Sequence, residues 1–182
     1  MPAATVQRMR PLEGRLFSLS DNQNGMIARP EDRDLDDVGL LRGEVVPDEP
    51  VVFRRHLGNV PRDLVMGASV SLLLISEHVR SILAGGSFTG WATYPVRLLD
   101  RRGDEVAGYH GLAVTGRSKQ VDRAERQEML DSGDFGERVW ACRGAEDFYL
   151  DGSSSLVVVK RSVAVALRAG KVTNLHLVPV AT

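Results

Sequence analysis

The sequence is poor in cysteine and in long apolar runs. It has a single cysteine, Cys142, among 182 residues, which excludes an internal disulfide and a cysteine-based zinc cage and fits a reducing compartment. The longest aliphatic run, residues 72–75, is far shorter than the ~20 residues that span a bilayer, and the first residues lack the apolar stretch of a secretory signal. We therefore expect a cytoplasmic protein that does not enter a membrane.

An excess of charge of either sign is also missing. The 23 Lys and Arg residues against 24 Asp and Glu residues give a formal net charge of −1, so no overall field favours a nucleic-acid backbone. With 43% hydrophobic and 26% charged residues, the composition is typical of a soluble globular protein. We expect residues 1–182 to form one domain that does not bind nucleic acid.

Catalytic motifs are absent as well. The sequence has no Gly-x-Ser-x-Gly elbow, and the spacing of a phosphate loop at residues 85–90 is followed by Trp91 instead of Lys. No two of the four histidines have the spacing that places two imidazoles on one metal ion; they are His56, His78, His110 and His176. We therefore assign no catalytic residue, metal or cofactor, and keep only His110 as a candidate acid or base.

Residues 1–50 are expected to be irregular, with one short strand at residues 15–19 before a turn-rich stretch. Further along, residues 51–53 predict a strand, and residues 96–115 predict a hairpin in which Gly103 supplies a positive φ. Residues 124–130 contain good helix formers and favour a short helix.

The most informative pattern is an internal repeat. Residues 71–96 align without a gap on residues 155–180, an offset of 84, with seven of 26 positions identical. The identical positions are Ser71/Ser155, Val79/Val163, Leu83/Leu167, Gly86/Gly170, Thr89/Thr173, Pro95/Pro179 and Val96/Val180. We predict a duplicated strand-helix-strand unit with Leu83 and Leu167 both buried.

Local signals support this interpretation of each copy. Four aliphatic residues predict a buried strand, and Ser76 and Glu77 then offer an N-cap oxygen and a first-turn acid. Gly86 and Gly170 stand where the C-terminus of a helix favours a left-handed residue. The expected fold class is α+β, with a mixed or antiparallel sheet and short helices packed on it.

Residues 31–37 concentrate five carboxylates in seven positions, at Glu31, Asp32, Asp34, Asp36 and Asp37. A solvated loop is one explanation. A docking surface for a basic partner is another, because concentrated negative charge speeds association and selects against acidic competitors. Calcium binding is a third, although the glycine turn and terminal Glu of a calcium loop are missing. We name these five residues as the candidate partner-binding site.

The order of several segments resembles a known family. These segments are residues 50–53 (PVVF), 59–63 (NVPRD), 74–79 (LISEHV), 109–117 (YHGLAVTGR), 146–149 (EDFY), 157–159 (VVV) and 179–180 (PV). The pattern resembles the immunity protein eleven family of bacterial polymorphic toxin systems, over roughly residues 50–182. The resemblance implies a small α+β protein that binds and neutralises a cognate toxin, with no catalytic residues to transfer. Residues 1–50 and 117–138 show no matching pattern.

Three functions follow from these observations. The first is a non-enzymatic binding protein that occludes a toxin. The second is a structural or scaffold module whose duplicated unit forms an interaction surface. The third is an enzyme with a dispersed site around His110, Asp147 and Tyr149. The sequence does not determine the oligomeric state.

Overall fold

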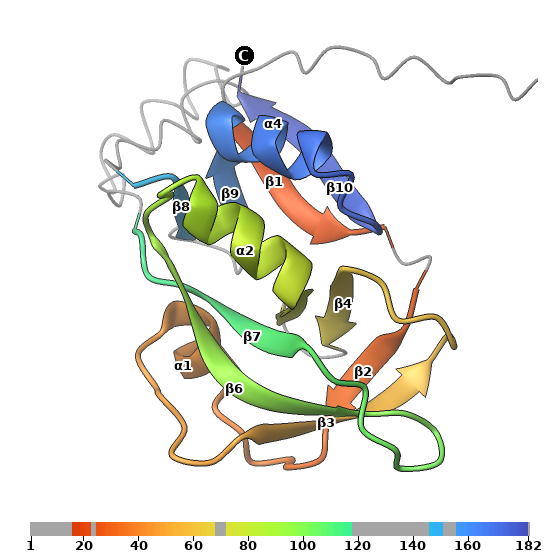
Figure 1. Ribbon diagram of the computed structural model, residues 1–182. Coiled ribbons are helices and arrows are strands. Elements are labelled where there is room, and N and C mark those ends of the chain that lie inside the picture. Colours follow the sequence, from red (N-terminus) through yellow and green to blue (C-terminus); the bar gives the residue numbers. More distant parts are fainter. Residues whose placement is uncertain (1–15, 23–24, 68–71, 118–145, 151–155, 182) are drawn as a thin grey trace, which may run out of the picture.

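The computed structural model describes residues 16–22, 25–67, 72–117, 146–150 and 156–181 (Figure 1). The helix expected at residues 124–130 and Cys142 lie outside this part of the chain. No helix in the described ranges has the length and apolar character needed to cross a bilayer.

The strands form two sheets. Six of them close into a barrel in the order β2-β3-β6-β7-β5-β4, and four form a second sheet in the order β10-β1-β9-β8. The barrel strands are β2 (Ile27–Pro30), β3 (Val51–Leu57), β4 (Leu64–Gly67), β5 (Leu73–Ser76), β6 (Trp91–Leu99) and β7 (Tyr109–Val114). The second sheet contains β1 (Leu16–Asp21), β8 (Phe148–Leu150), β9 (Val157–Lys160) and β10 (Leu175–Ala181). The barrel is mixed, because β2 is parallel to β4 and β3 is parallel to β6.

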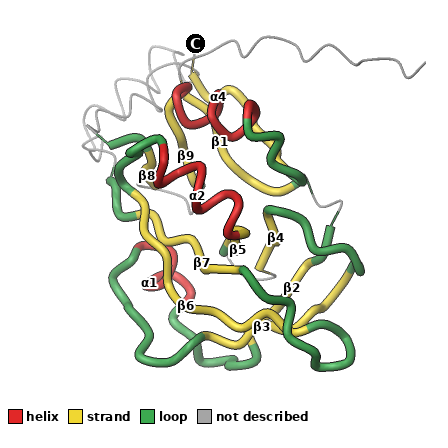
Figure 2. Tube along the Cα trace, viewed as in Figure 1, coloured by secondary structure: helices red, strands yellow, loops and turns green. Residues whose placement is uncertain are grey.

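In the described part of the chain, three short helices pack on these strands, which confirms the α+β class. They are α1 (Asp37–Arg42), α2 (Glu77–Gly85) and α4 (Arg161–Ala169). Ser76 caps α2 as predicted, since its hydroxyl accepts a hydrogen bond from the Val79 backbone N–H at 3.3 Å. Figure 2 shows α2 and α4 together near the second sheet, and α1 against the barrel.

The hydrophobic core is continuous between the two sheets. Phe53 and Leu74 of the barrel and Phe17 of the second sheet are fully buried in it. Leu83 of α2 and Leu167 of α4 are each 1% exposed, as predicted. Both helices therefore bury one apolar stripe, which is how short amphipathic helices are stabilised.

Both predicted strand-helix-strand segments are present, as β5-α2-β6 and β9-α4-β10. In each unit the two strands flank one antiparallel strand. This strand is β7 in the first unit and β1 in the second.

The correspondence at an offset of 84 extends beyond the aligned residues. Leu64 pairs with Ile75 as Phe148 pairs with Val159. The Ser76 N–H donates to the Asp63 carbonyl, and the Lys160 N–H donates to the Asp147 carbonyl, both at 2.9 Å. The matching arrangement thus starts at Asp63 and at Asp147. A common origin of the two units by duplication stays a prediction.

The prediction for the two shared glycines was wrong. Gly86 and Gly170 have φ of −80° and −71°, and the positive φ occurs one residue later, at Ser87 and Lys171. Close side-chain contacts favour glycine at both positions instead. A Cβ on Gly86 would lie 2.2 Å from the Phe88 ring, and one on Gly170 would lie 2.4 Å from Ile82 Cδ1.

The expectation of an irregular region at residues 1–50 was wrong for the part that the structure describes. The strand expected at residues 15–19 is confirmed as β1, but β2 and α1 also lie within residues 16–50. β1 acquires its partners from β9 and β10, more than 130 residues away, so its length is set by tertiary pairing. The hairpin at residues 96–115 is confirmed, with φ of +92° at Gly103.

Candidate functional site

Polar side chains gather where α2 begins. We name this group the α2 polar cluster: Asp63, Ser76, Glu77, His78 and His110. Asp63 directly precedes β4, and residues 76–78 span the end of β5 and the start of α2. His110 joins them because β7 pairs with β5 in a register that places it opposite Ile75.

Asp63 is the acceptor at the centre of one half of this cluster. Its carboxylate accepts hydrogen bonds from the Ser76 hydroxyl at 2.6 Å and from both the backbone N–H and the hydroxyl of Thr173 at 2.8 Å, and lies 3.2 Å from His78 Nδ1. Partial burial by itself would raise the pKa of Asp63, but these hydrogen bonds outweigh it and hold the pKa below its usual value. Because Thr173 precedes β10, Asp63 connects the barrel with the second sheet.

Glu77 is the centre of the other half. Its carboxylate accepts two hydrogen bonds from Arg80 at 2.7 Å and lies 2.8 Å from His110 Nε2. The hydrogen bonds with Arg80, and then with His110, lower the pKa of Glu77 to about 2. Glu77 is therefore a fixed anion at neutral pH.

A second Asp-Thr pair mirrors the first. Asp147 accepts hydrogen bonds from the backbone N–H and hydroxyl of Thr89, at 3.0 and 3.3 Å. At the offset of 84, Asp147 corresponds to Asp63 and Thr89 to Thr173. Each unit thus supplies an aspartate to the threonine of the other unit.

The second unit serves as an internal comparison for the α2 polar cluster. By offset or by strand register, the counterparts of Ser76, Glu77 and His110 are Lys160, Arg161 and Phe17. A matching strand-helix-strand unit therefore forms with basic and apolar residues at these positions. The polar side chains around Glu77 are not a requirement of this packing.

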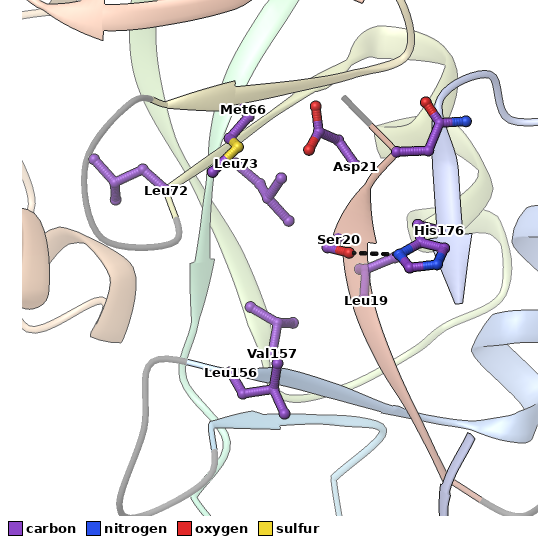
Figure 3. A pocket seen from close by; sticks show the side chains of 10 residues that line it. Leu19, Ser20, Asp21, Met66, Leu72, Leu73, Leu156, Val157 and His176 are labelled. Carbon is purple, nitrogen blue, oxygen red and sulfur yellow. Dashed lines mark hydrogen bonds between the residues drawn. The ribbon is translucent and has the colours of Figure 1, made fainter. Parts of the chain in front are cut away.

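A cavity of about 350 Å³ lies between the two sheets (Figure 3). Figure 3 shows Met66, Leu72 and Leu73 on one side, and Ser20 and His176 together on the other, where Ser20 Oγ lies 3.3 Å from His176 Nδ1. The lining is mainly apolar and is completed by Leu19, Asp21, Asn22, Leu156 and Val157. Its chemistry suits a small apolar group with polar atoms at one end.

The acidic residues of segment 31–37 have different local environments. Glu31 forms an ion pair with Arg54 at 2.5 Å, and Asp32 accepts a hydrogen bond from the Asp34 N–H. Asp36 caps α1 by accepting from the Gly39 N–H at 2.9 Å, and Asp37 is partly buried in the first turn. Asp32, Asp34 and Asp36 are exposed. The segment is therefore a charged surface with a defined backbone.

A groove rich in arginine overlaps this segment at Glu31 and Arg33, and the sequence reasoning missed it. We name it the arginine groove; it is lined by Arg29, Pro30, Glu31, Arg33, Arg54, Arg55 and His56. The run Arg54-Arg55-His56 is visible in the sequence. Its alignment with Arg29 depends on the pairing of β2 with β3, which no local pattern shows.

The residues suggested for a dispersed enzyme site are held by separate sets of contacts. His110 contacts Glu77, Asp147 contacts Thr89, and Tyr149 is fully buried. The end of β7 at Val114 is the end near the unit that contains Asp147. His110 lies four residues before Val114, which corresponds to about 13 Å along the strand, so His110 and Asp147 are near opposite ends of β7. Within the described ranges, no group of three or more His, Cys, Asp or Glu side chains could hold a metal ion.

The low pKa of Glu77 predicts how acid affects stability. Because the folded state lowers this pKa to about 2 from 4.5, ionised Glu77 favours folding above about pH 4.5, and this contribution is lost as the pH falls through about 2. We expect the difference in urea midpoint between the protein and Glu77→Gln to be present near neutral pH and to disappear at about pH 2. The exposed Glu49→Gln serves as the control, and a difference independent of pH would contradict the assignment.

Compared with known proteins, the chain matches no protein-family model and no curated protein.

Proposed function

We propose that the chain is a non-enzymatic binding protein of the immunity type, which neutralises a cognate bacterial toxin by covering its active site or substrate surface. Two observations support the proposal. The first is the resemblance of residues 50–182 to the immunity protein eleven family. The second, which carries the structural argument, is the exposed acidic surface of segment 31–37.

This surface is suited to docking because its backbone is already ordered. The Asp32 turn and the Asp36 cap hold the segment, so a partner does not have to immobilise a loose chain. Exposed carboxylates speed the encounter with a basic surface and disfavour acidic competitors. A basic face of a toxin is the partner that this charge would select.

Glu77 of the α2 polar cluster and the neighbouring Tyr109 are poorly suited to acid-base catalysis at neutral pH. A general acid or base acts best when its pKa lies near the working pH. The pKa of Glu77 is lowered to about 2, and burial together with the charge of Asp63 raises the pKa of the neighbouring Tyr109 to about 12. These groups hold their protonation states at neutral pH, as expected of fixed hydrogen-bonding partners.

A scaffold module is the second candidate. The observation that favours it is the matching strand pairing of two strand-helix-strand units whose helices α2 and α4 contact each other. Affinity purification from the producing strain, followed by mass spectrometry, separates the two. A single toxin supports the first proposal, and many unrelated partners or none contradict it.

The acidic surface gives a kinetic prediction. We expect Asp32→Asn/Asp34→Asn to slow association with the isolated toxin by about three- to tenfold at low salt, with a smaller effect at physiological salt. Stability should change little, because an asparagine at position 32 still accepts the hydrogen bond from residue 34. Association rates at two salt concentrations provide the measurement.

The control is Glu105→Gln/Glu146→Gln, which removes the same charge outside segment 31–37. Equal association rates for the protein and the segment variant, or an equal effect of the control, would show that the acidic segment has no special part in docking.

A further inference from the structure

The arginine groove lies on the barrel, on β2 and β3, at the end of the molecule away from α4 (Figure 1). Its volume is about 600 Å³. Arg29 on β2 pairs directly with Arg54 on β3, and both side chains are exposed. The preceding residues on the two strands, Ala28 and Phe53, are fully buried, so the alternation of the strands directs both arginines outward.

This arrangement is unfavourable for the isolated fold. Like charges directly opposite each other on neighbouring strands destabilise the pair. Four arginines line the groove and one carboxylate, that of Glu31, accompanies them, which leaves a formal charge of +3 with His56 neutral. The chain as a whole has a net charge of −1, so this local excess of positive charge favours the binding of an anionic ligand.

Two of the four arginines already have a partner in the structure. Glu31 pairs with Arg54, and Arg55 Nε donates to the carbonyl of Gly58. Arg29 and Arg33 differ, because neither has an ion-pair or hydrogen-bond partner in the part of the chain that the structure describes. Two guanidinium groups in one groove are therefore available for an anion.

Carboxylates match these groups, since a guanidinium binds a carboxylate through two parallel hydrogen bonds. The surroundings limit the length of the ligand. The exposed carboxylates of Asp32, Asp34 and Asp36 follow Glu31 directly, so a long polyanion that extended past the groove on this side would meet like charge. A short acidic peptide can end before this acidic segment, whereas a longer polyanion such as a nucleic acid would be repelled by it.

We propose that the arginine groove binds a short segment of a protein partner that is rich in Asp and Glu, with Arg29 and Arg33 as its main contacts. The inference goes beyond the proposed function, because it assigns a ligand to a second surface and does not require the partner to be a toxin. Together with segment 31–37, the groove places a basic and an acidic surface side by side.

Titration with hexaglutamate tests this proposal by isothermal calorimetry at low salt. We expect saturable binding that weakens as salt is added, and about a tenfold rise in Kd for Arg29→Gln/Arg33→Gln. The unfolding midpoint of this variant should not fall, because the substitution at position 29 removes the repulsion from Arg54. A purely structural role for the arginines predicts the opposite change in stability.

The matched control is Arg161→Gln/Lys171→Asn, which removes the same charge from exposed positions beside the second sheet. It should keep the Kd of the protein within about twofold. The proposal is overturned if hexaglutamate binds with a Kd above about 1 mM, or if the control weakens binding as much as the groove variant. Tighter binding of hexathymidylate than of hexaglutamate, lost in the groove variant, would overturn it in favour of a nucleic-acid ligand.

Discussion

Replacing Asp63 by alanine is expected to lower the free energy of unfolding by about 3 kcal/mol. The carboxylate is 16% exposed and contacts Ser76, His78 and Thr173. Its loss removes the hydrogen bond that orients the Ser76 cap of α2, and the hydrogen bonds that link the barrel to the second sheet. Hydrogen bonds to a charged group contribute more than neutral ones, and donors left without an acceptor add to the cost. Urea unfolding at neutral pH measures the loss.

Two related variants test the mechanism. Asp63→Asn keeps one acceptor oxygen and should lose about half as much stability. Asp147→Ala changes the corresponding aspartate, whose partners are Thr89 and, at 4.0 Å, Lys160 Nζ. It should cost less, because Asp63 accepts a hydrogen bond from Ser76 and contacts His78 in addition to its threonine. A loss below about 1 kcal/mol for Asp63→Ala would show that solvent replaces these contacts.

Gly90→Ala is expected to destabilise the protein by about 3 kcal/mol or more. Gly90 has φ of +80°, and a Cβ at this position would lie 2.2 Å from the backbone carbonyl oxygen of Phe148. The backbone segments at Gly90 and Phe148 are also joined by a hydrogen bond from the Phe148 N–H to the carbonyl of Thr89, the residue before Gly90. The clash therefore cannot be relieved by moving one of the two segments alone. The added methyl group would therefore push β8 away from the first unit. Thermal or urea unfolding gives the comparison.

Gly85→Ala is the matched control for this substitution. A Cβ on Gly85 meets no heavy atom within 4 Å in the described structure, and the residue ends α2. We expect a gain of about 0.5 kcal/mol, since alanine restricts the unfolded chain and favours a helix. Similar losses for both variants would mean that the close approach to Phe148 does not limit position 90.

The features that depend on local chemistry were predicted correctly from the sequence. Ser76 caps α2, Gly103 adopts the positive φ of its turn, and residues 51–53 lie in a strand. The apolar stripe with Leu83 predicted the buried face of α2 because i, i+3 and i+4 residues share a side of a helix. Each of these outcomes depends on interactions within a few residues.

The prediction failed where distant contacts decide the outcome. Glycine is common at helix ends because of its φ, and this rule misassigned Gly86 and Gly170, whose positions are close to the side chains of Phe88 and Ile82. The strand expected at residues 15–19 is present as β1 and extends to Asp21, but its partners β9 and β10 were not predicted. The local sequence at these positions does not show which distant residues will contact them.

The candidate surfaces also differ in how far the sequence predicted them. The five carboxylates at residues 31–37 were evident from composition, but the structure assigns Asp36 to a helix cap and Glu31 to Arg54. The α2 polar cluster and the arginine groove were not evident. The pairing of β5 with β7 brings His110 to Glu77, 33 positions away, and the pairing of β2 with β3 places Arg29 opposite Arg54, 25 positions away.

The sequence by itself determined the α+β class, the two strand-helix-strand units and the acidic segment, because period, capping and charge are properties of neighbouring residues. Only the tertiary structure decided the closure of the barrel and the position of Arg29 opposite Arg54. It also decided that Asp63 and Asp147 each hydrogen-bond a threonine of the other unit. Strand register and parallel pairing arise when a whole core is buried, and the free energy of that burial depends on contacts between residues far apart in the chain.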